Sequence, residues 1–309
     1  MKSNPISTKK IAEICGVSQG TVDRALNDRK GIRPETKEKI LAVAKEYGYR
    51  PNIHARCIAG GKSQLIGVVI FDLNNQYFSD ILTSIETYCT AQGYSTVVMF
   101  TDKNAQKEIE CIQTLYAMSV DGIILCPINC GEAFENFLLS LSIPLVTFGN
   151  RLNTFPYVGI DNTSAMTETV EYVLDKGYQR LIYVKPALKE KNTFAQTQRL
   201  QAFVQVCDAA GAEYVITDPA NAEQEADPGK KNAFVCPTDL YAIRLLSAAR
   251  RLQAGIIGFD NIRLIDALDL GLDSVAYDVE TAAKAAADCI LSGKQPQQIR
   301  HSIIRRGSI

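Results

Sequence analysis

The sequence predicts an N-terminal all-α helix-turn-helix domain followed by an α/β domain of two lobes. Short amphipathic helical patterns fill residues 1–49, and buried-strand and helix patterns alternate from residue 65 onward. Charge also separates along the chain. Residues 1–63 hold 13 Lys and Arg against 6 Asp and Glu, whereas the remainder holds 20 against 28. We therefore expect a basic domain at 1–49, a connector at 50–63 and an acidic body at 64–309.

The stretch VSQGTVDRALN, residues 17–27, is the centre of the first domain. Ser18 is a good N-cap, because its hydroxyl can accept from the free N–H groups of the first helical turn. The apolar arc of this helix holds Val22, Ala25 and Leu26, and the opposite arc holds Gln19, Gly20, Asp23 and Arg24. The polar arc is short, so it could enter a DNA major groove. There, Gln and Arg side chains can each make paired hydrogen bonds to a base edge.

Two further helices flank this stretch. Ile11, Ile14 and Cys15 are apolar at helical spacing behind a candidate N-cap at Ser7. A third amphipathic helix begins near Pro34, carries Ile40, Val43, Ala44 and Tyr47, and ends at Gly48. Residues 16–18 have the length and composition of a helix-turn-helix turn. The expected core of this domain is Ile11, Ile14, Val22, Leu26, Ile40 and Val43.

The composition is that of an ordinary globular protein, with 309 residues, 46% of them hydrophobic and 22% charged. The first residues carry no apolar segment typical of a secretory signal, and no run approaches the length of a membrane span. Nine cysteines without regular spacing indicate a reducing compartment. With only two histidines, a zinc site is not expected. We expect a cytoplasmic protein with buried free thiols.

From residue 65 the pattern alternates between strands and helices. The expected strands are 65–71, 95–100, 121–126, 144–148, 180–184, 213–217, 232–236, 255–258 and 299–306. The expected helices are 77–92, 105–118, 132–141, 164–176, 196–211, 239–253 and 280–292. Two lobes of this kind enclose a cleft that suits a small polar ligand. Between Thr217 and Asn232, however, only DPANAEQEADPGKK is available, so we expect this crossover to lack its covering helix and leave one wall of the cleft in doubt.

Four motifs carry a resemblance to a known family. They are T-V-x-R-x-L-N at 21–27, P-E-T-K-E-K-I at 34–40, G-Y-R-P-N at 48–52 and A-R at 55–56. Together they resemble the lactose/galactose/purine repressor family, and the resemblance runs in order from Ser7 to about Arg306. It implies a homodimeric repressor of transcription that binds double-stranded operator DNA. It also implies a periplasmic-binding-protein-like effector domain.

The resemblance and the polar arc together nominate the DNA-binding residues. Gln19 and Arg24 are expected to read bases, and Lys10, Thr21 and Asn27 to contact phosphates. The remaining candidates are Ser7, Ser18, Gly20, Asn52, Arg56 and Ile58. The resemblance implies a hinge helix in the connector that orders on operator DNA and inserts an apolar residue into the minor groove. The family usually has Leu at that position, where this chain has Ile58. From the residues alone, a flexible linker is an equal alternative.

Residues placed to line the cleft nominate the effector site, and several of them follow the ends of strands. Aromatic candidates are Phe71, Tyr77 and Tyr277; polar candidates are Asp72, Asn150, Arg151, Arg199, Asp239 and Asp260. Arg199, Asp239 and Asp260 match ligand-contacting positions of the resembled family, although Asp239 could equally cap its helix. Phe78 is expected in the core. Carboxylates, one cation and few aromatic side chains favour a sugar or sugar derivative over a nucleobase. Sugar acids and sugar phosphates remain open.

The sequence lacks the motifs that an enzyme of this fold would need. It has no phosphate-binding G-x-x-x-x-G-K-[ST], no G-x-G-x-x-G after a strand, and no Ser or Cys nucleophile beside a usable His. We therefore expect no catalysis and no cofactor. The alternatives are a regulator whose effector pocket is degenerate, a sugar-processing enzyme and a solute-binding protein. The last of these has no use for residues 1–63.

Overall fold

A computed structural model describes residues 6–26, 28–49, 62–185, 187, 190–296 and 298–309. The chain divides into two compact units, Met1–Ser63 and Gln64–Ile309, each with its own core. Asn27 and the connector residues Asn52, Arg56 and Ile58 lie outside the described residues. Among the residues that are described, no helix is both long enough and apolar enough to cross a membrane.

The first unit contains three helices, α1 (Thr8–Cys15), α2 (Gln19–Leu26) and α3 (Pro34–Glu46). The expected caps form. Ser7 Oγ accepts from the Lys10 N–H at 3.3 Å, and Ser18 Oγ accepts from the Thr21 N–H at 3.2 Å. Gly16 ends α1 with a φ of +68°, a conformation that glycine adopts at little cost. The tight turn between α1 and α2 therefore follows directly from the local sequence.

The core of the first unit differs from expectation at Ile14, and Tyr47 of the third amphipathic pattern also lies at the surface. Ile11, Val22 and Ile40 are fully buried, as expected. Ile14, in contrast, is 38% exposed and Tyr47 is 52% exposed. The small residues Ala12, Ala25 and Ala44 take up central positions instead, and they allow the helices to approach closely. Tyr49 packs on the cluster in place of Tyr47, because the chain turns after α3 and the Tyr49 N–H bonds to the Ala44 carbonyl at 2.8 Å.

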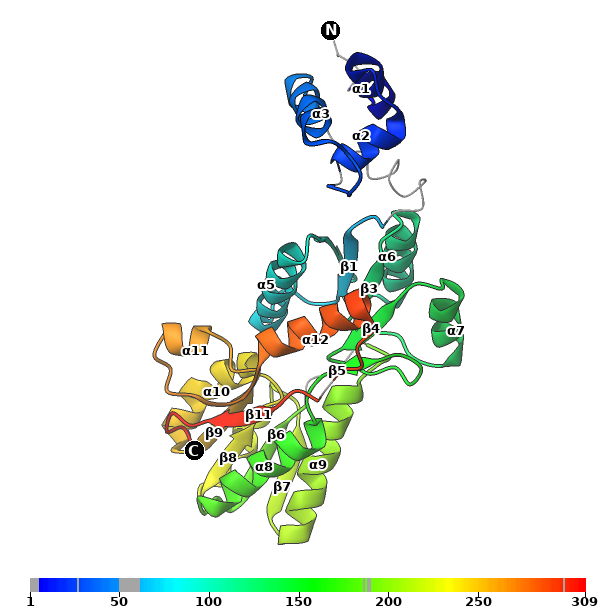
Figure 1. Ribbon diagram of the computed structural model, residues 1–309. Helices are drawn as coiled ribbons and strands as arrows, with labels where there is room; N and C mark the ends of the chain where they lie inside the picture. The colour runs from blue at the N-terminus through cyan, green and yellow to red at the C-terminus, as the bar shows by residue number, and fades with distance from the viewer. Residues whose placement is uncertain (1–5, 27, 50–61, 186, 188–189, 297) are drawn as a thin grey trace. The chain divides into compact units, whose positions relative to one another are not determined.

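In the second unit, the first lobe is a parallel sheet of order β2-β1-β3-β4-β5. Its strands are β1 (Leu65–Ile70), β2 (Ser95–Phe100), β3 (Gly122–Leu125), β4 (Leu145–Phe148) and β5 (Tyr157–Val158). Helices α5 (Gln76–Ala91) and α12 (Val279–Ser292) cover one face, and α6 (Ala105–Ala117) and α7 (Glu132–Ser140) cover the other. Helix α12 therefore returns from the end of the chain to pack beside α5 (Figure 1).

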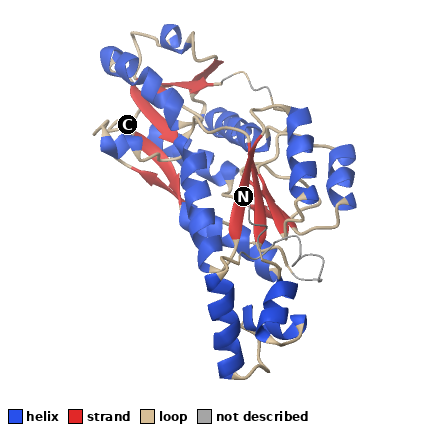
Figure 2. Cartoon of the chain, turned by 90° about the horizontal axis from the view of Figure 1, so that it is seen from above, coloured by secondary structure: helices blue, strands red, loops and turns tan. Residues whose placement is uncertain are grey.

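The second lobe is a sheet of order β11-β10-β9-β8-β6-β7, in which only β11 runs antiparallel to its neighbour. The strands are β6 (Arg180–Val184), β7 (Glu213–Thr217), β8 (Asn232–Val235), β9 (Gly255–Phe259), β10 (Asp273–Tyr277) and β11 (His301–Ile304). Helices α8 (Asn162–Asp175) and α9 (Phe194–Ala210) cover one face, and α10 (Asp239–Leu252) covers the other. Figure 2 shows the strands of the chain in two separate groups flanked by helices.

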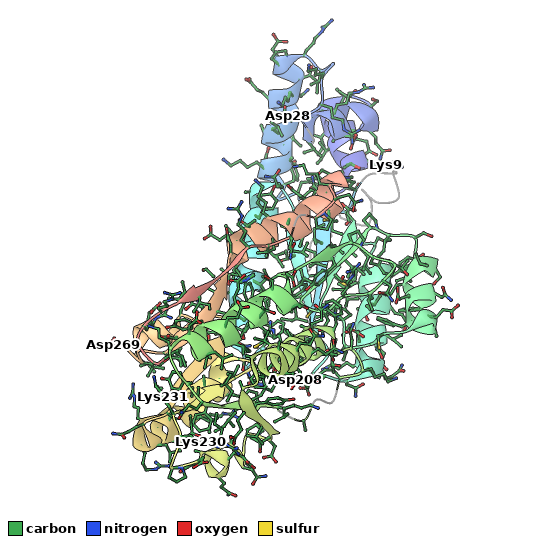
Figure 3. All side chains as sticks on the ribbon, turned by 90° about the horizontal axis from the view of Figure 1, so that it is seen from below. Lys9, Asp28, Asp208, Lys230, Lys231 and Asp269 are labelled. Atoms are coloured by element: carbon green, nitrogen blue, oxygen red, sulfur yellow. The ribbon has the colours of Figure 1, made fainter. Side chains whose placement is uncertain are left out.

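The crossover from β7 to β8 is shortened, as the sequence predicted. It contains only a 3₁₀ turn, η1 (Ala222–Glu225), whose Ala222 is fully buried against the face that α10 also covers. Lys230 pairs with Glu213 at the start of β7. Figure 3 labels Lys230 and Lys231 at the outer end of the second lobe. The strands β5 and β10 and the short α11 (Leu264–Ala267) were not predicted from the sequence.

Candidate functional site

Helix α2 presents a polar surface on the first unit. Val22 and Ala25 are buried, whereas Gln19, Gly20, Asp23 and Arg24 are exposed. Asp23 has a partner in the fold, because its carboxylate lies 3.3 Å from the Arg29 guanidinium. Lys10 is also exposed, and its ammonium lies 3.0 Å from the Glu13 carboxylate. The resulting surface offers hydrogen-bond donors and acceptors on a short capped helix.

The second unit contains a cavity of about 510 Å³ between its two lobes. It lies at the carboxyl ends of parallel strands, which is where open α/β sheets bind ligands. From the first lobe it is lined by the segments that follow β1, β2 and β4. From the second lobe it is lined by α9, the start of α10 and the ends of β9 and β10. This volume lies within the range of small-molecule sites.

Asp260 follows β9 and holds the two lobes together at the cavity. Its Oδ2 accepts from Asn75 Nδ2 at 2.7 Å, and its Oδ1 accepts from the Tyr277 hydroxyl at 3.1 Å. Burial raises the pKa of Asp260, and the nearby Arg199 guanidinium opposes that rise. Its backbone has a φ of +104°, which residues with a side chain rarely adopt. Strained residues of this kind cluster at ligand sites.

Arg199 extends from α9 to the cavity and is only 6% exposed. Its Nε donates to Asn162 Oδ1 at 2.8 Å, and its Nη1 donates to the Pro237 carbonyl at 2.9 Å. The guanidinium carbon also stacks over the Phe259 ring, 3.4 Å from the ring centroid. These contacts fix the cation beside the cavity, where it balances the buried Asp260 carboxylate.

A second charged cluster joins the lobes at the cavity. Lys103, which follows β2, has its ammonium 3.3 Å from Asp72 Oδ2 and 3.3 Å from Glu190 Oε1. Asp72 belongs to the first lobe and Glu190 to the second, in the segment between β6 and α9. Sequence reasoning nominated Asp72 but missed Lys103 and Glu190.

Asn150 fastens the segment before α9 to the first lobe. Its Nδ2 donates to the carbonyls of Pro127 and Asn192, at 3.2 and 3.1 Å, and its Oδ1 accepts from the Ala195 N–H at 3.3 Å. The N–H groups of Lys191 and Asn192 both donate to the Ile128 carbonyl. Asn150 thus lines the cavity while its own polar groups are occupied.

Three family models match this chain. "Bacterial regulatory proteins, lacI family" matches residues 7–52, and "Periplasmic binding protein-like domain" matches residues 170–309. "Periplasmic binding proteins and sugar binding domain of LacI family" matches residues 63–227, which is more than half of the chain. The chain belongs to the LacI family of bacterial regulatory proteins.

Individual relatives cover nearly the whole chain. The HTH-type transcriptional regulator PtxS of Pseudomonas plecoglossicida is 28% identical over 332 aligned positions, which cover 98% of this chain and 95% of that protein. The Lac repressor dimer bound to operator and the anti-inducer ONPF has a TM-score of 0.84 at 20% identity, covering 99% and 100%. The complex of the transcriptional regulator CelR with cellobiose has a TM-score of 0.64 at 20% identity, covering 98% and 99%. These two structures share the fold of this chain.

Within this LacI-family cavity, seven of the nine nominated effector residues line the wall. They are Phe71, Asp72, Tyr77, Asn150, Arg199, Asp260 and Tyr277. The other two do not line it. Arg151 is exposed, and only its backbone carbonyl takes part in the network, accepting from Asn192 Nδ2 at 3.0 Å. The reason is that the chain turns at Asn150, which directs that side chain inward instead.

Asp239 is the second nominated residue outside the cavity wall. It is fully buried, with Oδ2 accepting from the Ile262 N–H at 2.8 Å and Oδ1 accepting from the Ser274 hydroxyl at 2.6 Å. Gly258 leaves room for this carboxyl, because a Cβ there would lie 2.1 Å from Asp239 Oδ1. Asp239 joins α10 to β9 and β10, and burial raises its pKa to about 8.

The expectation that the cavity has few aromatic side chains was wrong. The cavity is rich in aromatic side chains, because Phe71, Tyr77, Phe78, Tyr157, Tyr241 and Tyr277 all line it. Phe78 is buried, as expected, yet also reaches the wall. None of the cavity's lining residues comes from 218–231, so the shortened crossover contributes nothing to the wall. The lining instead draws on α9 and α10.

Proposed function

We propose that this protein is a cytoplasmic, homodimeric repressor that binds pseudo-palindromic operator DNA through α2 and responds to a sugar or sugar derivative held between its lobes. The observation that carries the proposal is the exposed polar arc of α2 on a capped helix-turn-helix unit. Membership of the LacI family supports the DNA-binding role, and the family model that matches 63–227 is a sugar-binding domain. The cavity in the second unit supports the effector role.

On the DNA side, Gln19 and Arg24 are proposed to read base edges, because both are exposed on the polar arc. Lys10 and Thr21 are proposed to contact phosphates, together with Asn27. Ser7 and Ser18 take part chiefly by capping α1 and α2, which orients the first turns toward the backbone of the DNA. Gly20 leaves space beside Gln19. Asn52, Arg56 and Ile58 are proposed to act in the connector.

On the effector side, Arg199 and Asp260 are proposed to bind ligand hydroxyls, and the aromatic wall is proposed to cover a sugar ring. Bonds such as Asn75 to Asp260 link the lobes across the cavity. A ligand that binds one arrangement of the lobes better than another shifts their populations. That shift would reach the operator through the connector.

Selection from random DNA tests the proposal. The full-length protein should recover an inverted repeat with two half-sites around a central step, since a two-fold dimer places two reading helices on the duplex. A single asymmetric site would contradict the dimer, and recovery of no site would contradict the DNA-binding role.

We also propose that the cavity binds its sugar without chemistry. Prolonged incubation of pentoses and hexoses with the protein should return them unchanged when analysed by chromatography. Turnover that depends on Asp260 or Glu190 would favour the enzyme alternative.

A further inference from the structure

Only one of the two oxygens of the Glu190 carboxylate has a partner among the described residues. The Glu190 side chain is only 7% exposed, and Oε1 lies 3.3 Å from the Lys103 ammonium. Oε2 is buried and has no hydrogen-bond partner among the described residues. A buried carboxylate oxygen is costly to leave unpaired, so such an atom calls for an explanation. Glu190 also lines the cavity between the lobes, so its unpartnered oxygen belongs to a residue of the cavity wall.

The other buried polar groups around the cavity are largely occupied by one another. Both oxygens of Asp260 accept protein hydrogen bonds, and Arg199 donates to Asn162 and to Pro237. Within the described part of the chain, two further buried polar atoms lack a hydrogen bond, in Thr101 and His301, and neither residue lines the cavity. Of these three residues with an unpartnered buried atom, only Glu190 lines the cavity.

The position of Glu190 is fixed by the residues that follow it. The N–H groups of Lys191 and Asn192 donate to the Ile128 carbonyl at 3.0 and 2.8 Å, and the Asn192 carbonyl accepts from Asn150. These bonds tie the second-lobe segment to the first lobe next to the acceptor. A ligand therefore meets a carboxylate that is already ordered, which reduces the entropy lost on binding.

The charge around Glu190 selects the kind of ligand group. The Lys103 ammonium is shared by two carboxylates, Asp72 and Glu190, so this end of the cavity carries one excess negative charge. An anionic group of a ligand is repelled there, and a hydrogen-bond donor is attracted. Elsewhere on the wall, Arg199 and Asp260 carry opposite charges and Arg244 adds a further cation, so the excess negative charge is local to the Glu190 end.

We infer that Glu190 is a specificity-determining residue of the effector cavity, and that it accepts a hydrogen bond from a hydroxyl or ammonium group of a neutral sugar or an amino sugar. Sugar acids and sugar phosphates are disfavoured. This inference rests on the proposed function and narrows its ligand class.

A binding screen with the full-length protein tests the inference. Each candidate ligand is first tested for its effect on the thermal stability of the protein, and the Kd of every hit is then measured by calorimetry. The candidates are D-glucose, D-galactose, D-ribose, cellobiose, D-glucosamine, D-gluconate and D-glucose 6-phosphate. Hits should fall among the neutral and amino sugars. Glu190→Gln should weaken each hit about tenfold to a hundredfold, because Gln directs its oxygen toward Lys103 and turns an N–H₂ donor toward the ligand's donor.

The matched control is Asp80→Asn. Asp80 Oδ1 accepts from Arg263 at 2.6 Å across the lobes, but neither residue lines the cavity. This variant should bind every hit about as tightly as the wild type does. Deoxy analogues of the best hit add a readout that does not depend on the variant's stability. The analogue that lacks the bonded hydroxyl should bind the wild type weakly, and it should bind Glu190→Gln equally weakly.

Several outcomes would overturn the inference. One is a sugar whose affinity is unchanged in Glu190→Gln, and another is an equal loss of affinity in Asp80→Asn. A third is binding confined to D-gluconate or D-glucose 6-phosphate, which would move recognition to a cation such as Arg244. Absence of any hit would also overturn it. The DNA-binding part of the proposed function would still be judged separately, because the selection from random DNA needs no sugar.

Discussion

Arg24 is exposed on α2, as Gln19 is, and a guanidinium can pair with two acceptors of one guanine. We expect Arg24→Ala to weaken operator binding by about 1–3 kcal/mol and to relax the preference at one base pair. Arg24→Lys keeps the charge but loses the paired geometry, so it should retain phosphate attraction without that preference. Binding to a library of single-base operator variants measures both. An equal loss on every sequence would identify Arg24 as a phosphate contact.

Ionisation of the Asp239 carboxyl is expected to make the free energy of unfolding depend on pH. Burial raises its pKa from 3.8 to about 8. Between these values the unfolded state binds fewer protons than the folded state, so stability falls as pH rises, by about 1.4 kcal/mol per pH unit for one group. Asp239→Asn cannot ionise and can still bond both Ile262 and Ser274.

Urea titrations of the wild type and Asp239→Asn between about pH 5 and about pH 7 measure this dependence. The variant should gain stability relative to the wild type as pH rises. Glu108, whose pKa burial raises to about 7, is present in both proteins and cancels in the difference. If the free energies of unfolding of the two proteins changed with pH in parallel, Asp239 would not have a raised pKa in the folded state.

Position in the sequence explains which site residues could be found. Phe71, Asn150 and Asp260 come at or just after the ends of predicted strands, and parallel strands bring such residues to one edge of a sheet. Lys103 and Glu190 gave no comparable signal, because their pairing joins two lobes and depends on how the lobes close. Tyr157 was missed because it lies on β5, a strand that was not predicted.

Helix α2 depends on its N-cap, since Ser18 Oγ accepts from the Thr21 N–H and also bonds the Thr21 hydroxyl at 2.9 Å. Ser18→Ala should destabilise the first turn by about 1 kcal/mol. Amide hydrogen exchange in α2 should then be faster by roughly fivefold. Ser18→Thr keeps the acceptor and should stay close to the wild type. Unchanged exchange in Ser18→Ala would show that tertiary packing alone holds the helix.

Elements with strong periodicity could be predicted from the sequence. The bounds of β2, β6 and β7 agree with the predicted ranges, and β1 ends one residue early. Strand β10 was missed because it begins with the buried polar pair Asp273 and Ser274, and Asp273 accepts from the Tyr172 hydroxyl and from the N–H groups of residues 306–308. A strand stabilised by polar partners lacks the apolar run that identifies its neighbours. Strand β5 has only two residues, too few for a pattern.

At the scale of the second unit, the lobes are joined by bonds on more than one side. Asn75 bonds Asp260, Arg263 bonds Asp80 at 2.6 Å, and Asn150 bonds the segment before α9. Helix α12 adds an apolar connection, since its alanines belong to a core that includes residues of both lobes. We therefore expect a ligand in the cavity to change the relative arrangement of the lobes.

Coupling between the cavity and the operator can be measured as a change in operator affinity on binding of the sugar. The affinity of the full-length protein for its selected operator is measured with and without a saturating sugar from the screen, in the wild type and in Arg199→Ala. We expect the sugar to change the wild-type Kd by about 5- to 150-fold, the usual range of allosteric coupling, and to leave the Kd of Arg199→Ala unchanged. If the operator Kd of the wild type is the same with and without the sugar, the cavity is not coupled to operator binding.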